Sequence, residues 1–140
     1  MGLPTFTNPV RVDHAGDGHF GKPRGGHTHT GEDALCIVGA TVRSGVAGKV
    51  TKLGFCYGSG PGAWDAPRPY RYVEVTCVEG LKHRYLYVEP SVDIGARITV
   101  GVPIGVAQDV AARYPDSGML AHVHYEVFEG DKQYLDPRQF

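Results

Sequence analysis

Regular alternation of apolar and polar side chains predicts a strand near the end of the chain, over residues 120–128. Successive side chains of a strand point to opposite faces, so His122, His124 and Glu126 should share one face. The valines and the tyrosine between them should face a core. The pattern therefore predicts a half-buried strand that presents two imidazoles and a carboxylate together.

Shorter apolar runs, cut by glycine and proline, predict the rest of a sheet. Glu79-Gly80 should turn one strand into the next and form a hairpin. A loop is expected over 58–69, and residues 108–113 are the one segment that favours a helical turn. The remaining predicted strand regions are 36–42, 45–50, 52–57, 70–78, 82–88 and 100–107.

Composition supports this interpretation, since 20 Gly and 10 Pro in 140 residues favour many turns and few helices. The fold class predicted is all-β, mainly an antiparallel sheet or sandwich with few helical turns. A chain of this length forms one domain, here residues 1–140. The polar, glycine-rich residues 1–34 should be an irregular lead-in, followed by a β core over 35–140.

Charge and hydropathy exclude several classes of partner. The formal net charge is −1, so no basic field for nucleic acid is expected. No apolar run approaches roughly 18 residues, so no membrane span is expected. The start, Met1 to Pro4, lacks a secretory signal, which predicts synthesis in a cytoplasm. Three cysteines without a CxxC spacing predict free thiols at Cys36, Cys56 and Cys77.

Histidine and acidic residues form two candidate metal-binding patterns. A turn around Gly31 could bring His29 and Asp33 onto one ion, and the pair His122 and His124 could supply a third ligand. Catalytic zinc keeps three protein ligands and a water, which would leave the other histidine free to move protons. Spacing alone leaves open the alternative of an ordinary strand with two exposed histidines. Glu126 could orient an imidazole or be a solvated carboxylate.

Over residues 18–137 the chain resembles the lysostaphin/LytM-type zinc peptidoglycan endopeptidases. The resemblance is carried by an ordered set of short motifs rather than by any single one. They are Gly18-His-Phe-Gly-Lys-Pro-Arg24, His29-Thr-Gly-Glu-Asp33, the glycine–valine strand pair 39–42 and 45–50, Ile94-Gly-Ala-Arg-Ile98, Val102-Pro-Ile-Gly105, His122-Val-His-Tyr-Glu126 and Leu135-Asp-Pro137.

The resemblance implies a β-sheet domain with an open groove that binds one Zn²⁺ per chain. His29, Asp33 and His124 would hold the zinc, and His122 would be the catalytic imidazole. The substrate would be bacterial peptidoglycan, cut in its stem peptides or cross-links. The expected setting is a monomeric phage endolysin or virion-associated lysin, released from the host cytoplasm to the cell wall or carried by the virion.

One position departs from the family pattern. Where the family has Tyr-x-His-Leu, this chain has Tyr85-Leu-Tyr87-Val88, so Tyr87 replaces a second catalytic histidine. Alternation predicts His83, Tyr85 and Tyr87 on one strand face. Tyr87 could donate its phenol proton to an oxyanion. All three presumed ligands and His122 remain, which favours an active enzyme. The alternative is a catalytically silent relative that binds peptidoglycan or a partner enzyme.

Several further residues are candidates for lesser roles. Trp64, in the loop 58–69 with Asp65 and Arg68, and Arg24, at the end of the first motif, are candidates for substrate contact. His14, His19 and His27 are expected to be solvated loop residues, each able to take a fourth zinc position in a resting form. A third hypothesis, a cupin-like metal-binding β-barrel, agrees with the HxH spacing but not with the ordered motifs.

Overall fold

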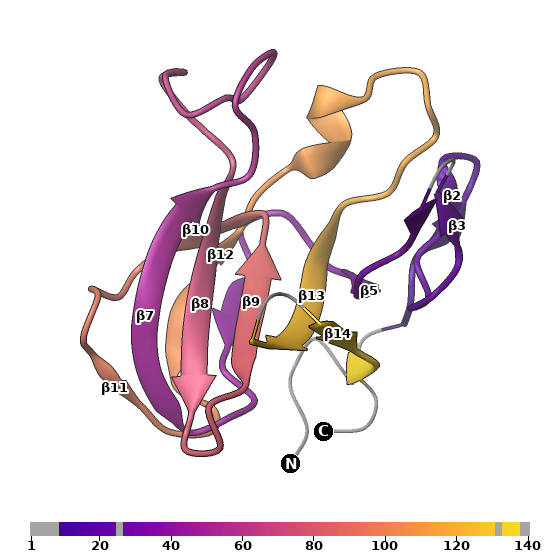
Figure 1. Ribbon diagram of the computed structural model, residues 1–140. Helices are drawn as coiled ribbons and strands as arrows, with labels where there is room; N and C mark the ends of the chain where they lie inside the picture. The colour runs from indigo at the N-terminus through magenta and orange to yellow at the C-terminus, as the bar shows by residue number, and fades with distance from the viewer. Residues whose placement is uncertain (1–8, 25–26, 131–132, 138–140) are drawn as a thin grey trace.

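A computed structural model describes residues 9–24, 27–130 and 133–137, and its main feature is a seven-stranded antiparallel sheet (Figure 1). Its strands follow the order β11-β7-β8-β9-β13-β14, and β5 also pairs with β13. β5 lies along the first half of β13 and β14 along the second half. The bounds are β5 (Glu32–Leu35), β7 (Gly48–Phe55), β8 (Arg71–Cys77), β9 (Lys82–Leu86), β11 (Arg97–Ile98), β13 (His122–Glu129) and β14 (Gln133–Leu135).

A smaller antiparallel sheet is formed by β10 (Val88–Pro90), β12 (Pro103–Ala107) and β6 (Thr41–Arg43). The apolar core draws on both sheets, and Val73, Tyr85, Val88, Ile104 and Val127 are fully buried in it. Burial of this kind stabilises by about 1.5–3 kcal/mol for each large apolar side chain.

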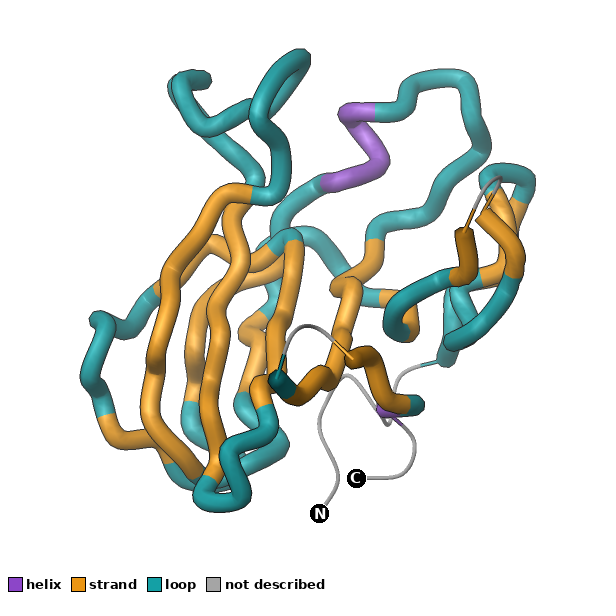
Figure 2. The backbone as a smooth tube through the Cα atoms, in the orientation of Figure 1, coloured by secondary structure: helices purple, strands orange, loops and turns teal. Residues whose placement is uncertain are grey.

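Two short hairpins and one helical turn complete the described part of the chain (Figure 2). The hairpins pair β1 (Val12–Asp13) with β2 (Gly16–Asp17), and β3 (Pro23–Arg24) with β4 (His27–Thr28). The 3₁₀ helix η1 (Val110–Arg113) lies inside the segment expected to be helical. No helix of the described residues is long and apolar enough to cross a bilayer.

The all-β, antiparallel prediction is confirmed, and so is the hairpin between β8 and β9. Gly80, in its turn, has a φ of +85°, a backbone conformation that glycine adopts without strain. The core face expected for β13 is also confirmed, because Val123, Tyr125 and Val127 are buried in the core cluster.

Two local predictions were wrong. The lead-in expected to be irregular over 1–34 contains four short strands and part of β5, which belongs to the main sheet. Glu32-Asp33-Ala34-Leu35 has no apolar alternation to mark it as a strand, although its first three residues are buried. The strand expected over 82–88 is interrupted at Tyr87, whose φ of +70° separates β9 from β10.

Candidate metal centre

The pairing of β5 with β13 brings the two halves of the predicted site together. In this antiparallel register Asp33 lies directly opposite His124. His29 precedes β5, and Gly31 lets that segment approach β13 closely. A Cβ atom at Gly31 would lie 2.2 Å from the carbonyl oxygen of Tyr125, so only glycine fits without displacing backbone.

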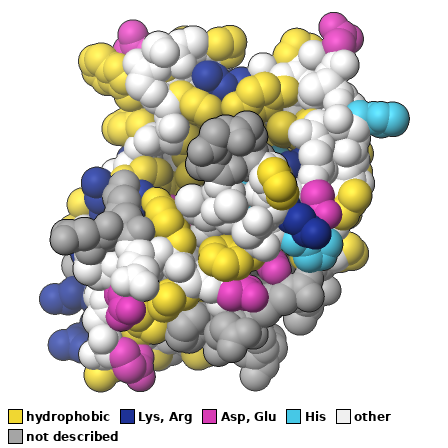
Figure 3. Space-filling view, turned by 45° about the vertical axis from the view of Figure 1, so that its right-hand side comes forward, with side chains coloured by type: hydrophobic (Ala, Val, Ile, Leu, Met, Phe, Trp, Pro, Cys, Tyr) yellow, Lys and Arg dark blue, Asp and Glu magenta, His cyan; other side chains and the backbone are white. Residues whose placement is uncertain are grey.

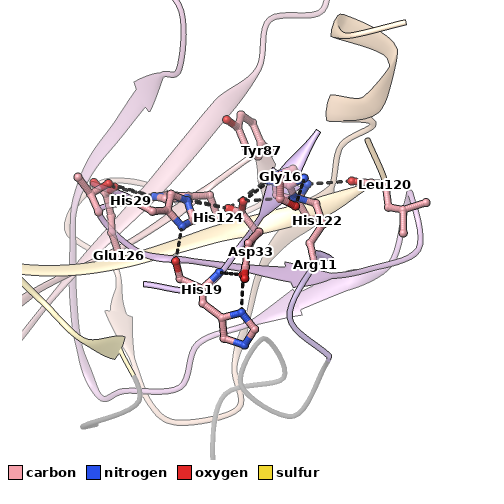
Figure 4. Close-up of polar contacts among 12 residues, drawn as sticks. Arg11, Gly16, His19, His29, Asp33, Tyr87, Leu120, His122, His124 and Glu126 are labelled. Carbon is pink, nitrogen blue, oxygen red and sulfur yellow. Dashed lines mark hydrogen bonds and ion pairs between the residues drawn. The ribbon is translucent and has the colours of Figure 1, made fainter. Parts of the chain in front are cut away.

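Three buried side chains direct one ligand atom each toward a common point (Figure 4). Asp33 Oδ1 lies 2.9 Å from His124 Nδ1 and 3.4 Å from His29 Nε2. The two imidazole nitrogens are 3.1 Å apart. Tetrahedral bonds of about 2.0–2.1 Å separate the ligand atoms of zinc by roughly 3.3 Å, so these spacings fit one zinc ion.

The other nitrogen of each ring fixes which atom is free to bind a metal. His29 Nδ1 donates to the carbonyl oxygen of His19 at 3.1 Å. His124 Nε2 donates to Glu126 Oε1 at 2.8 Å. A carbonyl can only accept, so the lone pair of His29 is on Nε2, and in the neutral ring of His124 the bond to the carboxylate likewise leaves the lone pair on Nδ1. Two lone pairs and a carboxylate oxygen that converge in this way favour a cation between them.

Electrostatics at the centre agree with that conclusion. Burial acts to lower the pKa of His124, but hydrogen bonds to Asp33 and Glu126 outweigh it and raise the pKa to about 9, so the ring favours a proton on Nδ1 at the position that a bound cation would take. Burial acts to raise the pKa of Asp33, but hydrogen bonds from His124 and His29 outweigh it and hold that pKa well below its usual range. The cluster therefore stabilises positive charge at the position where the three ligand atoms meet.

Arg11 anchors the second oxygen of Asp33. Its Nη2 donates to Asp33 Oδ2 at 2.9 Å, and its Nη1 donates to Asp13 Oδ1 at 2.7 Å. Backbone hydrogen bonds between residue 11 and residues 18 and 33 hold the arginine in place. Sequence reasoning missed Arg11, because no motif spacing connects it to the histidines. The contact leaves Oδ1 alone to face the centre.

His122 lies beside the three ligand atoms without joining them. Its Nδ1 donates to the carbonyl oxygen of Leu120 at 2.8 Å, so the Nε2 lone pair faces Asp33 Oδ1 at 3.6 Å. Burial lowers the pKa of this imidazole, although Asp33 opposes the shift. His122 is therefore held neutral, with its proton-accepting nitrogen at the centre.

Tyr87 reaches the same centre in a way that alternation did not predict. His83 and Tyr85 lie on the core face of β9, against Tyr125. The positive φ of Tyr87 turns its ring to the opposite face, where its centroid is 5.4 Å from that of His122. Grouping all three side chains on one face was therefore wrong. Burial raises the pKa of Tyr87 above its usual value, so the hydroxyl keeps its proton.

The centre opens into a cavity of about 390 Å³. The residues that line it include the candidate ligands His29, Asp33 and His124 together with Tyr87, Tyr114 and Met119. The loop 56–70 and the segment 108–121 rise on either side in Figure 1, and Figure 3 shows the surface hollowed between two upper projections. A substrate can thus reach the cluster from solvent.

The remaining candidates are placed as follows. Glu126 is buried and bonded to His124 and to Thr30 Oγ1, so it is not a solvated carboxylate. Trp64 is exposed and does not line the cavity. His19 is half-exposed and its ring is bonded to Asp17. The side chains of Arg24 and His27 lie outside the described part of the chain, so their predicted roles stay predictions.

No protein-family model and no curated protein matches the chain. Solved structures do match it, and the three described here are 20–22% identical to it. The catalytic domain of the antimicrobial peptidase lysostaphin from Staphylococcus simulans is 20% identical with a TM-score of 0.67, over 89% of both chains. A variant of the catalytic domain of the prophage-encoded M23 protein EnpA from Enterococcus faecalis is 22% identical with a TM-score of 0.66, over 96% of this chain and 94% of that one.

A zinc containing peptidase from Vibrio cholerae is 22% identical with a TM-score of 0.62, over 93% of this chain but 36% of that chain. Together the fold and the site define a β-sheet protein with a His-Asp-His cluster at the base of an open cavity. The resemblance to the lysostaphin/LytM type is confirmed at the level of the fold: this chain has the fold of those peptidases.

Proposed function

We propose that the protein is a zinc-dependent endopeptidase that hydrolyses peptide bonds in bacterial peptidoglycan, with one zinc ion per chain held by His29, Asp33 and His124. The convergence of two imidazole lone pairs and one carboxylate oxygen within 2.9–3.4 Å carries the proposal. A separate neutral imidazole, His122, borders that point. The lysostaphin-type fold supports the choice of substrate.

Bound zinc supplies a Lewis acid that lowers the pKa of water to about 7 and polarises a carbonyl group. His122 Nε2 accepts the proton of the attacking water and returns it to the leaving amine. The Tyr87 hydroxyl donates a hydrogen bond to the carbonyl oxygen as negative charge develops there and keeps its own proton. Arg11 and Glu126 hold Asp33 and His124 in their ligating orientations.

The test combines metal analysis with digestion of purified sacculi, from walls with diaminopimelate cross-links and from walls with glycine bridges. We expect about one zinc per chain and release of free amino groups from one of the two substrates. His122→Ala should keep its zinc and lose about 10²–10⁴-fold in rate, while His124→Ala should lose the zinc. His14→Ala, a change of an exposed histidine, is the control. Full lytic activity in His122→Ala contradicts the proposed mechanism.

A second function follows from Tyr87 at the position where the family motif has histidine. A silent relative would bind zinc and pellet with sacculi but release no amino groups. The same assays separate it from the peptidase, because only turnover differs. EnpA is encoded by a prophage, which supports a phage lysin as the biological setting. That setting predicts a monomeric, zinc-loaded chain that, added from outside, lyses cells only after their envelope has been permeabilised.

A further inference from the structure

A second tyrosine and then a third connect Tyr87 to the rim of the cavity. Tyr57 follows β7, and its ring stacks on that of Tyr87 with centroids 6.3 Å apart and an angle of 18° between the planes. Tyr114 follows η1 and lines the cavity with Tyr87. Three phenol groups from three different segments thus lie in one row beside the metal centre.

The hydrogen bonds along this row have a defined direction. The hydroxyl of Tyr57 donates to the hydroxyl oxygen of Tyr87 at 3.2 Å. The hydroxyls of Tyr57 and Tyr114 are 2.8 Å apart. Because Tyr57 has a single proton and gives it to Tyr87, Tyr114 is the donor in the second bond. Among the described residues, none accepts the proton of Tyr87, so that proton is left for another acceptor.

Arg113 links the two segments that carry Tyr57 and Tyr114. Its guanidinium lies over the ring of Tyr57, with Cζ 3.5 Å from the centroid. The same group donates to the carbonyl oxygens of Pro61 and Ser59, in the loop that follows Tyr57. A cation on the face of a phenol withdraws electron density from it, which makes the Tyr57 hydroxyl a stronger donor.

We propose that Tyr57 and Tyr114 are positioning residues that hold and polarise the Tyr87 hydroxyl, so that its proton is directed to the carbonyl oxygen of the substrate. The inference rests on the proposed function and adds two residues to it. Each bond in a chain of hydroxyl groups strengthens the next. The chain of Tyr114 to Tyr57 to Tyr87 therefore compensates for the histidine that the family motif has at residue 87.

The test uses the full chain loaded with zinc and the sacculus substrate that the wild type cleaves. Tyr57→Phe keeps the ring stack and removes one hydroxyl. We expect kcat to fall about three- to tenfold, with KM and zinc content unchanged. Tyr70→Phe is the matched control: its ring also packs on Tyr57, with centroids 5.9 Å apart, but its hydroxyl donates to the carbonyl oxygen of Asp109. It should leave kcat unchanged.

A double-mutant cycle separates a positioning role from a general loss of packing. If Tyr57 acts through Tyr87, the variant with both Tyr57→Phe and Tyr87→Phe should be no slower than Tyr87→Phe alone. Additive losses would overturn the proposal, and so would wild-type kcat in Tyr57→Phe. Tyr114→Phe should show a smaller loss than Tyr57→Phe, because its bond is one step further from the substrate.

A spectroscopic measurement does not depend on turnover. In protein labelled with ¹³Cζ-tyrosine, Tyr57→Phe should move the resonance of Tyr87, which loses an accepted hydrogen bond, and Tyr70→Phe should not. An unmoved resonance overturns the hydroxyl chain even if the enzyme is active. If Tyr57→Phe moves the resonance of Tyr87 but the wild-type protein cleaves neither type of sacculus, the hydrogen bond stands. The proposed function and this catalytic role are then overturned.

Discussion

The ion pair of Arg11 with Asp33 is the least exposed charged contact at the centre. Both side chains are almost fully buried, at 3% and 4% exposure. A buried ion pair contributes little net stability, but removal of one partner leaves the other uncompensated. The arginine also decides which carboxylate oxygen faces the histidines. Its role therefore lies in the orientation of Asp33 as much as in charge balance.

Arg11→Met should weaken zinc binding by about 10–100-fold, because Asp33 loses the contact that fixes its carboxylate. Competition with a zinc chelator of known affinity measures the change. Arg11→Lys keeps a positive charge in case the methionine variant does not fold, and it should give a smaller loss. Arg43→Met removes an exposed arginine bonded to the carbonyl oxygen of Gly101 and serves as the control. Wild-type zinc affinity in both Arg11 variants would contradict the anchoring role.

Single residues differ in how far the sequence could predict them. The shared face of His122, His124 and Glu126 follows from alternation, because β13 is a regular strand. The position of Tyr87 does not follow, because tyrosine rarely adopts a positive φ and nothing in the local sequence marks one. Arg11 was equally hidden, since its partners are set by the packing of the N-terminal hairpins rather than by spacing.

At the scale of elements, the close contact between β13 and the segment before β5 depends on one glycine. Gly31→Ala would place a methyl group against the backbone of Tyr125 and Glu126. We expect a loss of about 1–3 kcal/mol in the free energy of unfolding, since this is an overpacked contact. Zinc affinity should fall with it, because His29 is displaced from His124.

Urea denaturation and zinc titration measure the two effects. Gly58→Ala is the matched control, since a Cβ atom there meets nothing within 4 Å and its φ is not positive. It should change neither quantity. A Gly31→Ala protein with wild-type stability and zinc affinity would show that β5 and β13 can separate without cost.

Elements with strong patterns were predicted well, and those fixed by pairing were not. The strands β8 and β13 are rich in β-branched and aromatic residues, and their positions agree with the prediction. β5 was missed because Glu32 and Asp33 are charged residues in a polar, glycine-rich stretch that is typical of a loop. Their place in the sheet depends on hydrogen bonds to a strand about 90 positions later, a relationship that no local pattern contains.

At the scale of the whole molecule, His83 makes stability depend on pH. Its ring is buried, at 1% exposure, and Nδ1 lies 2.5 Å from the hydroxyl of Tyr125. Burial lowers the pKa of this imidazole to about 4, whereas in the unfolded chain it is about 6.5. Between these values the unfolded chain binds more protons than the folded protein, so stability is full above about pH 6.5 and falls as pH decreases toward 4.

The expected loss across this window is at most about 3 kcal/mol, from a shift of roughly two and a half pKa units. His83→Gln should remove it while still offering the Tyr125 hydroxyl a partner. The quantity to measure is the difference in unfolding free energy between wild type and variant, by urea denaturation at several pH values. His14→Gln, at an exposed histidine, should leave the slope unchanged. A difference that does not vary with pH would refute this account of His83.

The fold class could be predicted from the whole sequence because glycine and proline interrupt every long segment, which leaves short strands as the only regular structure. The order of strands in the sheet could not, since it depends on which edges pair. β13 shares one edge between β5 and β14, segments from opposite ends of the chain. The candidate site depends on this pairing, so its ligands could be proposed from motifs but their geometry could not.

The pairing of Asp33 with His124 spans 91 residues of sequence, which has a consequence for biosynthesis. A growing polypeptide on the ribosome contains His29 and Asp33 first, and the strand that completes the candidate ligand set is translated about 90 residues later. The nascent chain therefore cannot assemble the proposed metal centre until β13 has left the ribosome. Metal acquisition must follow the synthesis of β13, and a product truncated before β13 would lack the proposed centre.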